Sequence, residues 1–136
     1  MIQPAVLLDT DIVSWYLRGH PLAVQHGQGY LAAHKRFTFS SITQYEILRG
    51  LKARGAPTRL VAFEQFSAVG TILPIDDAII RRAADIYADL YRRGELIADA
   101  DTFIAATALV HGLVMVTNNE AHFRRITGLQ VDNWLS

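Results

Sequence analysis

The sequence predicts an α/β fold with a short, mostly parallel central sheet between helices. Two segments carry this prediction, AVLL at 5–8 and LVMVT at 113–117. Both are short, uninterrupted apolar runs, which is the pattern of strands buried on both faces of a parallel sheet. The segments between the expected strands read as one or two helices each, and such crossovers connect parallel strands.

The first half of the chain alternates helices and strands. A helix over 11–18 is stopped by Gly19 and Pro21, and Ser40 or Ser41 is placed to cap the helix after the second strand. FTFS alternates aromatic and hydroxyl residues, as a strand does. The further elements expected here are a helix over 21–34, a strand over 37–40, and helices over 42–54 and 58–68.

The second half contains the clearest helical pattern, which begins at Asp76 or Asp77 and ends at Gly94. Its apolar stripe at helical spacing comprises Ile79, Ala83, Tyr87, Leu90 and Tyr91. Two pairs on its other face are spaced for i,i+4 ion pairs, Arg81 with Asp85 and Asp89 with Arg93. The remaining elements are a strand over 71–74, a helix over 101–111, the strand over 113–117, a short helix over 121–125 and an edge segment over 129–131.

Length and composition fit one domain over residues 1–136 that folds without disulfides. The chain has 136 residues, 51% of them hydrophobic and 19% charged, and it contains no cysteine. This composition is typical of a globular protein in a reducing compartment, so we expect a cytoplasmic location. The N-terminus has neither the length of a membrane span nor the pattern of a signal peptide, so we expect no membrane association.

The balance of charges gives no general attraction to nucleic acid, because 13 basic residues offset 13 acidic ones. Binding of RNA or DNA would therefore depend on local clusters of arginine and lysine. The candidates are the pairs Arg81-Arg82, Arg92-Arg93 and Arg124-Arg125, together with Arg49, Lys52 and Arg54. Each pair also fits a solvated helix face, and both interpretations stay open at this point.

Acidic side chains lie near the carboxyl ends of the expected strands, where a ligand would bind. Asp9 and Asp11 follow the first strand, and Asn119 and Glu120 follow the strand over 113–117. Ligands of open parallel sheets bind beyond the carboxyl ends of the strands. Asp99 and Asp101 open the helix that leads into the second of these strands, so topology can bring three acidic clusters to one edge.

Carboxylates gathered in this way point to a divalent cation. They raise one another's pKa unless positive charge is present, and Mg²⁺ binds oxygen ligands of this kind. Such a metal activates water and stabilises the oxygens of a phosphodiester, which is nuclease chemistry. The five histidines form no pair at ligand spacing, so zinc is not expected, and each reads as structural or exposed.

Each acid also has an ordinary structural interpretation. Asp9 fits the N-cap of the helix over 11–18, and Asp11 fits compensation of that helix's dipole. One of Asp99 and Asp101 fits a cap of the next helix. Glu46 points away from the apolar side that periodicity predicts for its helix, which places it on the surface.

The sequence resembles the PIN-domain ribonucleases of the VapC toxin type over nearly its whole length. The segments that carry the resemblance are LLDTDIV at 7–13, SSITQYEILRGL at 40–51, DTFIAATALVHGLVMVTNN at 101–119 and GLQVDNW at 128–134. The resemblance implies a three-layer α/β/α fold of the PIN type. Carried over by position, the family's acids fall on Asp9, Glu46 and Asp101, and the fourth acidic position falls on Asn119.

The resemblance also implies roles for these residues. Asp9 and Asp101 would hold the metal, Glu46 would lie near it, and Thr117 would orient Asp9 by a hydrogen bond. Two further departures from the family pattern are Asp11, where asparagine is more usual, and the additional carboxylate of Asp99. Either would supplement the outer shell of the metal.

The activity implied is Mg²⁺-dependent cleavage of RNA, with Mn²⁺ as a substitute. The expected partners are the RNA substrate, a second copy of the chain in a homodimer, and a DNA-binding VapB-type antitoxin that blocks the acidic groove. Two alternatives remain. LLDTDIV also fits the nucleophile motif of haloacid-dehalogenase-like phosphatases, with Asp9 as nucleophile and Asp11 as acid. The neutral Asn119 also fits a non-catalytic module that binds RNA or a partner.

Overall fold

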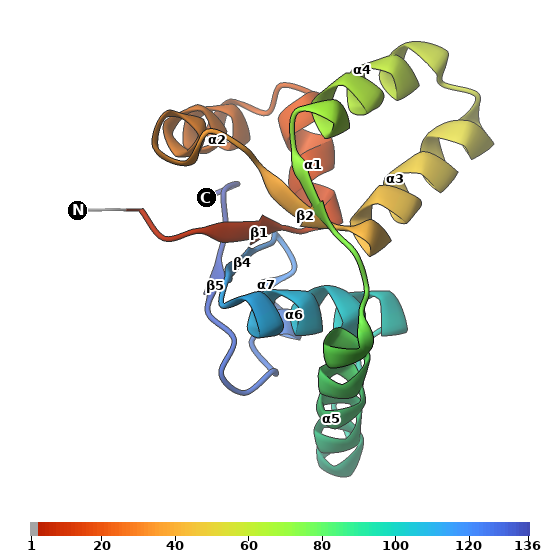
Figure 1. The fold of residues 1–136 in the computed structure, drawn as a ribbon, viewed down its shortest axis with the longest axis vertical. Coiled ribbons are helices and arrows are strands. Elements are labelled where there is room, and N and C mark those ends of the chain that lie inside the picture. The colour runs from red at the N-terminus through yellow and green to blue at the C-terminus, as the bar shows by residue number, and fades with distance from the viewer. Residues whose placement is uncertain (1–2) are drawn as a thin grey trace.

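Five short strands lie between two groups of helices in the computed structural model, which describes residues 3–136 (Figure 1). Every expected element is present, and each bound agrees with the expected one to within two residues. The elements are β1 (Val6–Leu8), α1 (Thr10–Leu17), α2 (Pro21–His34), β2 (Thr38–Ser40), α3 (Ser41–Arg54), α4 (Pro57–Ala68), β3 (Thr71–Leu73), α5 (Asp77–Arg93), α6 (Asp99–His111), β4 (Val114–Val116), α7 (Glu120–Phe123) and β5 (Val131–Asp132).

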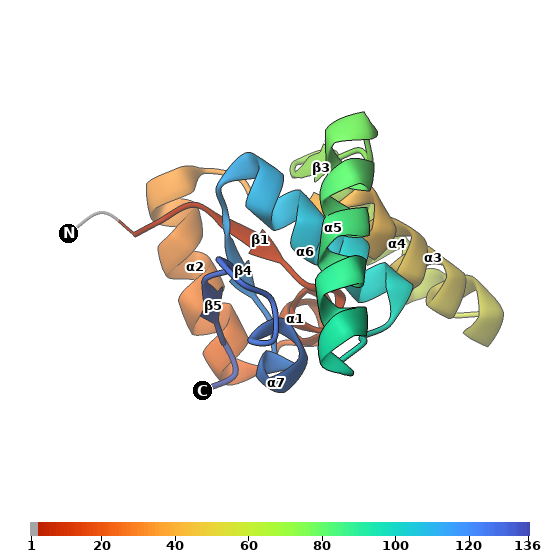
Figure 2. The same cartoon turned by 90° about the horizontal axis from the view of Figure 1, so that it is seen from below.

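All strand pairs are parallel, as the sequence predicts. β1, β4 and β5 form one sheet in that order (Figure 2). In its register, Leu7 lies opposite Met115 and Val116 lies opposite Asp132. β2 and β3 pair separately, and β2 lies against β1 without regular ladder bonds to it. The central layer is therefore divided into two hydrogen-bonded parts.

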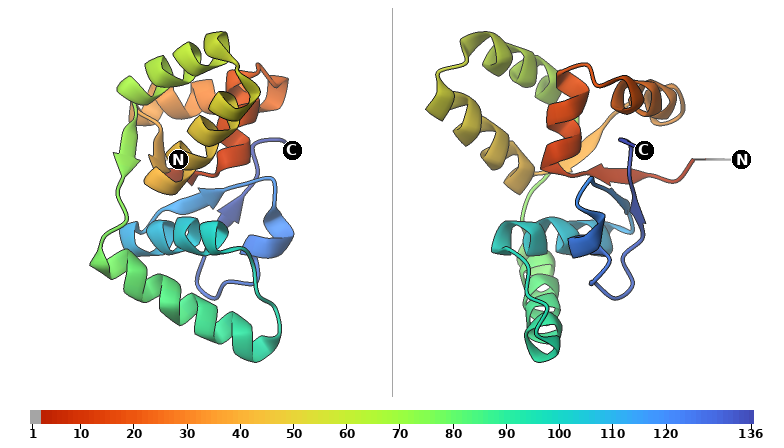
Figure 3. Two further views of the ribbon diagram at one scale, coloured as in Figure 1. Left: turned by 90° about the vertical axis from the view of Figure 1, so that its right-hand side faces the viewer. Right: turned by 180° about the vertical axis from the view of Figure 1, so that it is seen from behind.

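The sheet separates two apolar cores, because neighbouring residues of a strand point to opposite faces. Leu7 and Met115 pack with α5 and α6, whereas Val6, Leu8 and Val116 pack on the other face. Figure 3 shows α5 and α6 on one side of the strands and α1 to α4 on the other. This is the three-layer α/β/α arrangement that the sequence predicts.

The helix ends confirm most of the expected caps and correct one. Ser40 caps α3 by accepting from the N–H groups of Ile42 and Thr43, and Asp76 caps α5. α6 begins at Asp99 after Ala98, two residues earlier than expected. The interpretation that Asp99 or Asp101 caps α6 is therefore wrong, because both lie inside its first turn.

The face that α5 buries differs from the predicted stripe. Ile79, Ala83 and Leu90 are buried as expected, together with Ile86, while Tyr87 and Tyr91 are exposed. The expected ion pair between Asp89 and Arg93 is present, with 2.7 Å between their nearest atoms. Arg81 pairs with Asp77 in place of Asp85. Within residues 3–136, no helix has the length and apolar character needed to span a bilayer.

Candidate active site

The carboxyl ends of β1 and β4 bring two distant segments together. The Asp9 N–H donates to the Val116 carbonyl at 2.9 Å, which extends the strand pairing by one residue. The chain then turns into α1 after β1 and into α7 after β4. α6 runs back across the sheet, so that its first turn lies at the same edge (Figure 1). Topology thus gathers the segments that carry the predicted acids.

Asp9 is a buried carboxylate held at both oxygens. Its side chain is 6% exposed, Oδ1 accepts from the Thr10 N–H at 2.8 Å, and Oδ2 accepts from the Thr117 hydroxyl at 2.7 Å. Asp9 is also the N-cap of α1, as the structural interpretation expects. Burial, and then the negative charge of Asp11, raises the pKa of Asp9 to about 8, although both hydrogen bonds act in the opposite direction.

Glu46 reaches the same edge from α3. Its Oε1 accepts from the Thr10 hydroxyl at 2.6 Å, and Oε2 lies 3.7 Å from the Arg49 guanidinium. The side chain is 19% exposed, so the surface placement from periodicity is wrong. The buried face of α3 runs through Thr43 and Ile47, while Tyr45 is 59% exposed. Periodicity misplaced Glu46 because it counted Tyr45 as apolar core.

Asp101 faces these groups from the first turn of α6. Burial, followed by the negative charge of Glu46, raises the pKa of Asp101, and the charge of Asp11 adds to the effect. His122 acts in the opposite direction. Since charges interact measurably over short distances only, these effects show that α1, α3, α6 and α7 present ionisable side chains to one region.

Asp11 links the loops that follow β1 and β4. Its Oδ2 accepts from the Asn118 N–H at 3.1 Å, while Oδ1 is buried and has no partner among the described residues. Burial raises the pKa of Asp11. A buried carboxylate oxygen without a partner is energetically costly, and a cation at this place would satisfy it.

Asn119 joins the hydrogen-bond network of the site through both its main chain and its side chain. Its N–H donates to the Thr117 hydroxyl at 2.9 Å, and its side-chain amide lies 2.8 Å from Nδ1 of His122. Thr117 thereby has its orientation fixed while it donates to Asp9. His122 was missed in the sequence as a member of this cluster. The signal that could have found it is its i,i+3 spacing from Asn119 at the start of a helix.

The comparisons with known proteins fit this arrangement. The family model of the PIN domain matches residues 6–129. The chain belongs to the PIN-domain family. Ribonuclease VapC2 of Haemophilus influenzae is 33% identical over 130 residues, which cover 95% of this chain and 97% of that protein. The tRNA(fMet)-specific endonuclease VapC of Shigella flexneri is 30% identical over 129 residues, which cover 94% and 96% of the two chains.

Solved structures show the same likeness for this PIN domain. The DNA-bound VapBC complex from Salmonella typhimurium contains a chain that superposes with a TM-score of 0.86 and is 30% identical. The superposition covers 97% of this chain and 99% of that one. The similarity thus extends over the whole α/β/α fold and includes every segment that carries an acidic side chain of the site.

Asp99 lies apart from the cluster in this PIN domain. It is exposed and lines a groove between α5 and α6 with Tyr87 and Phe103. Asp99 and Asp101 are two positions apart, about 200° around a helix, so they face opposite sides. The charge of Asp99 is absent from the groups that shift the pKa of Asp9 or Asp101.

The donor atoms fit a divalent metal ion, the class of cofactor that PIN-domain nucleases use. The side chains supply hard oxygen ligands, Asp11 presents a buried oxygen without a partner, and burial raises the pKa of three carboxyl groups. Within residues 3–136, no three acidic or histidine side chains are close enough to enclose an ion as they stand. The structure therefore presents the ligand chemistry without a closed coordination shell.

Proposed function

We propose that this PIN domain is a metal-dependent endoribonuclease and acts as the toxin of a VapBC-type pair. The observation that carries the proposal is the buried Asp9 carboxylate, raised in pKa and facing the acids of α3 and α6 in a chain similar to VapC ribonucleases. Burial makes the charged form of a carboxylate energetically costly. Such a group is therefore expected where a bound cation offsets its charge.

Each residue of the proposed site has a distinct task. Asp9 and Asp101 bind the ion, and Thr117 fixes the orientation of Asp9 through its hydroxyl. Glu46, held by Thr10, accepts a proton from the attacking water. Asn119 occupies the family's fourth acidic position without adding charge, which favours one tightly bound ion over two. When bound, the ion lowers the pKa of water and stabilises charge on the phosphoryl oxygens.

We take Mg²⁺ as the physiological ion and Mn²⁺ as a substitute, because both accept carboxylate ligands in six-coordinate sites. The partners proposed are a VapB-type antitoxin, after the VapBC complexes of the structural relatives, and a second copy of this chain. Initiator tRNA is the first substrate to test, since a relative at 30% identity is specific for tRNA(fMet).

The decisive variant is Asp101→Asn. It removes one charge from the proposed ligand set at constant size, so we expect cleavage of initiator tRNA or total RNA in Mg²⁺ to fall at least about 1,000-fold. Cleavage is followed by gel electrophoresis, with EDTA as the metal-free reference. Circular dichroism and thermal unfolding verify that the variant folds.

Asp99→Asn is the matched control, because it makes the same change in the same helical turn on the side away from the cluster. It should cleave RNA at the wild-type rate. Full activity of Asp101→Asn, with metal affinity intact, would contradict the proposed site. Equal loss in both variants would contradict the separation of Asp99 from the cluster.

The two alternatives make different predictions. A haloacid-dehalogenase-like phosphatase would form a phospho-aspartate at Asp9, which a small phosphate ester and mass spectrometry would trap; membership of the PIN family argues against it. A non-catalytic module would show no carboxylate-dependent binding of Mg²⁺ or Mn²⁺. Calorimetric titration of wild type against Asp9→Asn separates that module from the nuclease.

A further inference from the structure

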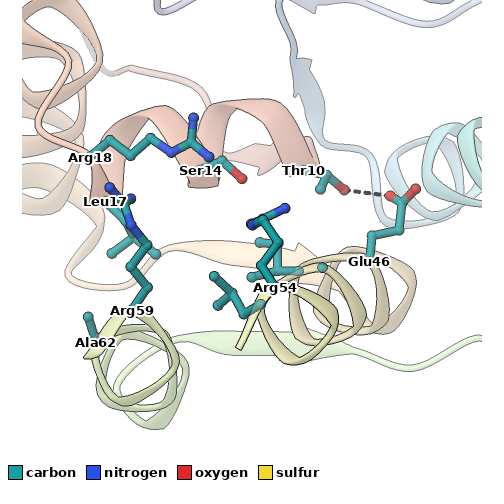
Figure 4. A pocket seen from close by; sticks show the side chains of 11 residues that line it. Thr10, Ser14, Leu17, Arg18, Glu46, Arg54, Arg59 and Ala62 are labelled. Atoms are coloured by element: carbon teal, nitrogen blue, oxygen red, sulfur yellow. Dashed lines mark hydrogen bonds between the residues drawn. The ribbon is translucent and has the colours of Figure 1, made fainter. Parts of the chain in front are cut away.

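We call the side chains of Asp9, Asp11, Glu46 and Asp101 the acidic cluster. A pocket of about 200 Å³ lies beside it, between α1, α3 and α4. Thr10 and Glu46 form its end nearest the cluster, and three arginines surround the remainder (Figure 4). We call this hollow the arginine pocket. The three arginines are Arg18, Arg54 and Arg59.

The three guanidinium groups of the arginine pocket have no acidic partners among the described residues. Arg81, Arg93 and Arg124 form ion pairs away from the pocket and Arg49 pairs with Glu46 at its edge, whereas no ion pair of Arg18, Arg54 or Arg59 is present within residues 3–136. Glu46 is the sole acid among the residues that line the pocket, and it already contacts Thr10 and Arg49. The pocket thus carries three guanidinium groups and a single carboxylate, which also faces Arg49.

Helix dipoles explain two of these arginines and leave the third unexplained. Arg18 is the C-cap of α1 and Arg54 is the last residue of α3, positions where a positive charge is favourable. Arg59 lies in the first turn of α4, where a positive charge is unfavourable. Its place at the pocket therefore has no basis in helix stability.

The backbone of α3 lies next to one of these arginines. Gly50 lies in the interior of this helix, where glycine is destabilising. A Cβ at Gly50 would lie 3.4 Å from Nη1 of Arg54, so the Arg54 guanidinium rests directly over the glycine. Arg18 is oriented as well, because its guanidinium stacks over the Trp15 ring at 5.5 Å from the centroid.

We propose that the arginine pocket binds the phosphates of a single-stranded RNA segment next to the scissile phosphate. Guanidinium groups match phosphate oxygens in geometry and charge, and positively charged grooves follow the backbone of single-stranded nucleic acid. Arg54 lies eight residues, about 12 Å, along α3 from Glu46. The phosphates bound are therefore neighbours of the reacting one.

This inference rests on the proposed function, because only a nuclease site beside the pocket requires RNA to cross it. An acidic peptide would also match the positive charge. RNA is favoured because the substrate that must reach Glu46 and Asp101 is a polyanion with regularly spaced phosphates. Three separate guanidinium groups around one pocket match several such phosphates. Since the net charge of the chain is zero, RNA affinity has to come from a local site of this kind.

The test compares two triple variants with equal loss of charge. Arg18→Gln/Arg54→Gln/Arg59→Gln removes the pocket, and Arg36→Gln/Arg82→Gln/Arg92→Gln removes three exposed arginines outside it. Binding of a fluorescein-labelled single-stranded RNA is measured by anisotropy in EDTA, over a range of salt concentrations, so that cleavage does not interfere. Circular dichroism verifies the fold of both variants.

We expect the pocket variant to bind at least about 30-fold more weakly, with a salt slope lower by about 2, since each phosphate contact on a single strand contributes about 0.7. The control variant should stay within about threefold of wild type. In Mg²⁺, the pocket variant should raise KM while kcat changes little. Arg59→Gln alone changes an exposed side chain and should weaken RNA binding about threefold. This single variant replaces the triple variant in the test if the triple variant does not fold.

Two results would overturn the inference and leave the proposed function intact. One is wild-type cleavage of RNA together with unchanged affinity and salt slope in the pocket variant. The other is a pocket variant that binds RNA normally and loses affinity for an acidic peptide, which would assign the hollow to a protein partner. Failure of the proposed function has a different signature, namely no metal-dependent cleavage by wild type although single-stranded RNA binds through the arginines.

Discussion

The acidic cluster and the arginine pocket are neighbours built in opposite ways. In the acidic cluster, Asp9 is buried and fixed by hydrogen bonds from Thr10 and Thr117. In the arginine pocket, exposed guanidiniums reach in from the ends of three helices and have no acidic partners among the described residues. The first arrangement is suited to an ion with strict geometry, and the second to a flexible polyanion.

Removing the Thr117 hydroxyl, which holds the Asp9 carboxylate, tests how far the activity of the acidic cluster depends on rigid geometry. In Thr117→Val the Asp9 carboxylate loses the hydroxyl donor at 2.7 Å, and the Asn119 N–H loses its acceptor. Loss of an outer contact of this type reduces metal affinity or activity by about 10- to 100-fold. We therefore expect RNA cleavage to fall by that factor, measured as kcat/KM in Mg²⁺.

Thr107→Val is the matched control for this prediction. Thr107 is also buried, and its hydroxyl donates only to the Phe103 carbonyl within α6. The change should leave RNA cleavage unchanged. If both valine variants lose activity to the same degree, the effect comes from general destabilisation, and the support of Asp9 is not specific.

The buried carboxylate should also give the metal-free protein a characteristic pH dependence. The pKa of Asp9 is about 8 in the folded state and near 3.8 in the unfolded chain. Between these values the folded state holds a proton that the unfolded state releases, so the free energy of unfolding falls as the pH rises from about 4 to about 8. The acidic cluster is then least stable at the pH where metal binds most easily.

Asp9→Asn removes this dependence, because asparagine carries no charge and also caps helices well. In EDTA we expect its free energy of unfolding to exceed that of wild type by a margin that grows from near zero at pH 4 to several kcal/mol at pH 8. Urea denaturation at the two pH values measures both. A variant equally stable or less stable than wild type at pH 8 would show that burial of Asp9 is not the dominant electrostatic cost.

Strand order alone places the acids of two distant segments at one edge of the sheet. Asp9 directly follows a buried strand, and Asp101 lies in the first turn of the helix that returns across the sheet, so both positions follow from the order of the elements. Glu46 is different. It lies on a helix whose inward face depends on the packing of α3 against its neighbours, so periodicity misplaced it and only the family resemblance identified it.

Sequence patterns do not predict the arginine pocket for a similar reason. Arg54 was recognised as part of a basic cluster with Arg49 and Lys52, yet in the structure Arg49 pairs with Glu46. The true neighbours of Arg54 are Arg18 and Arg59, which come from two other helices. Only tertiary packing brings these three side chains together, and no spacing along the chain records it.

The smallest expected effect tests the contribution of a single glycine to the pocket. Gly50→Ala adds a Cβ at ordinary contact distance from Arg54 in a helix interior. We expect the free energy of unfolding to rise by about 0.5–1 kcal/mol, as for glycine to alanine changes in helices. The affinity for single-stranded RNA should stay within about twofold of wild type, because an ordinary contact does not require the Arg54 guanidinium to move.

Gly29→Ala is the control, since Gly29 lies in α2 and a Cβ there would contact nothing within 4 Å. It should give the same gain in stability by urea denaturation and leave RNA affinity unchanged in the anisotropy assay. A difference between the two variants in affinity, with equal stability, would show that α3 keeps glycine at position 50 for the sake of Arg54. Equal affinities would mean that Arg54 binds RNA without needing that space, and the pocket would tolerate a more stable helix.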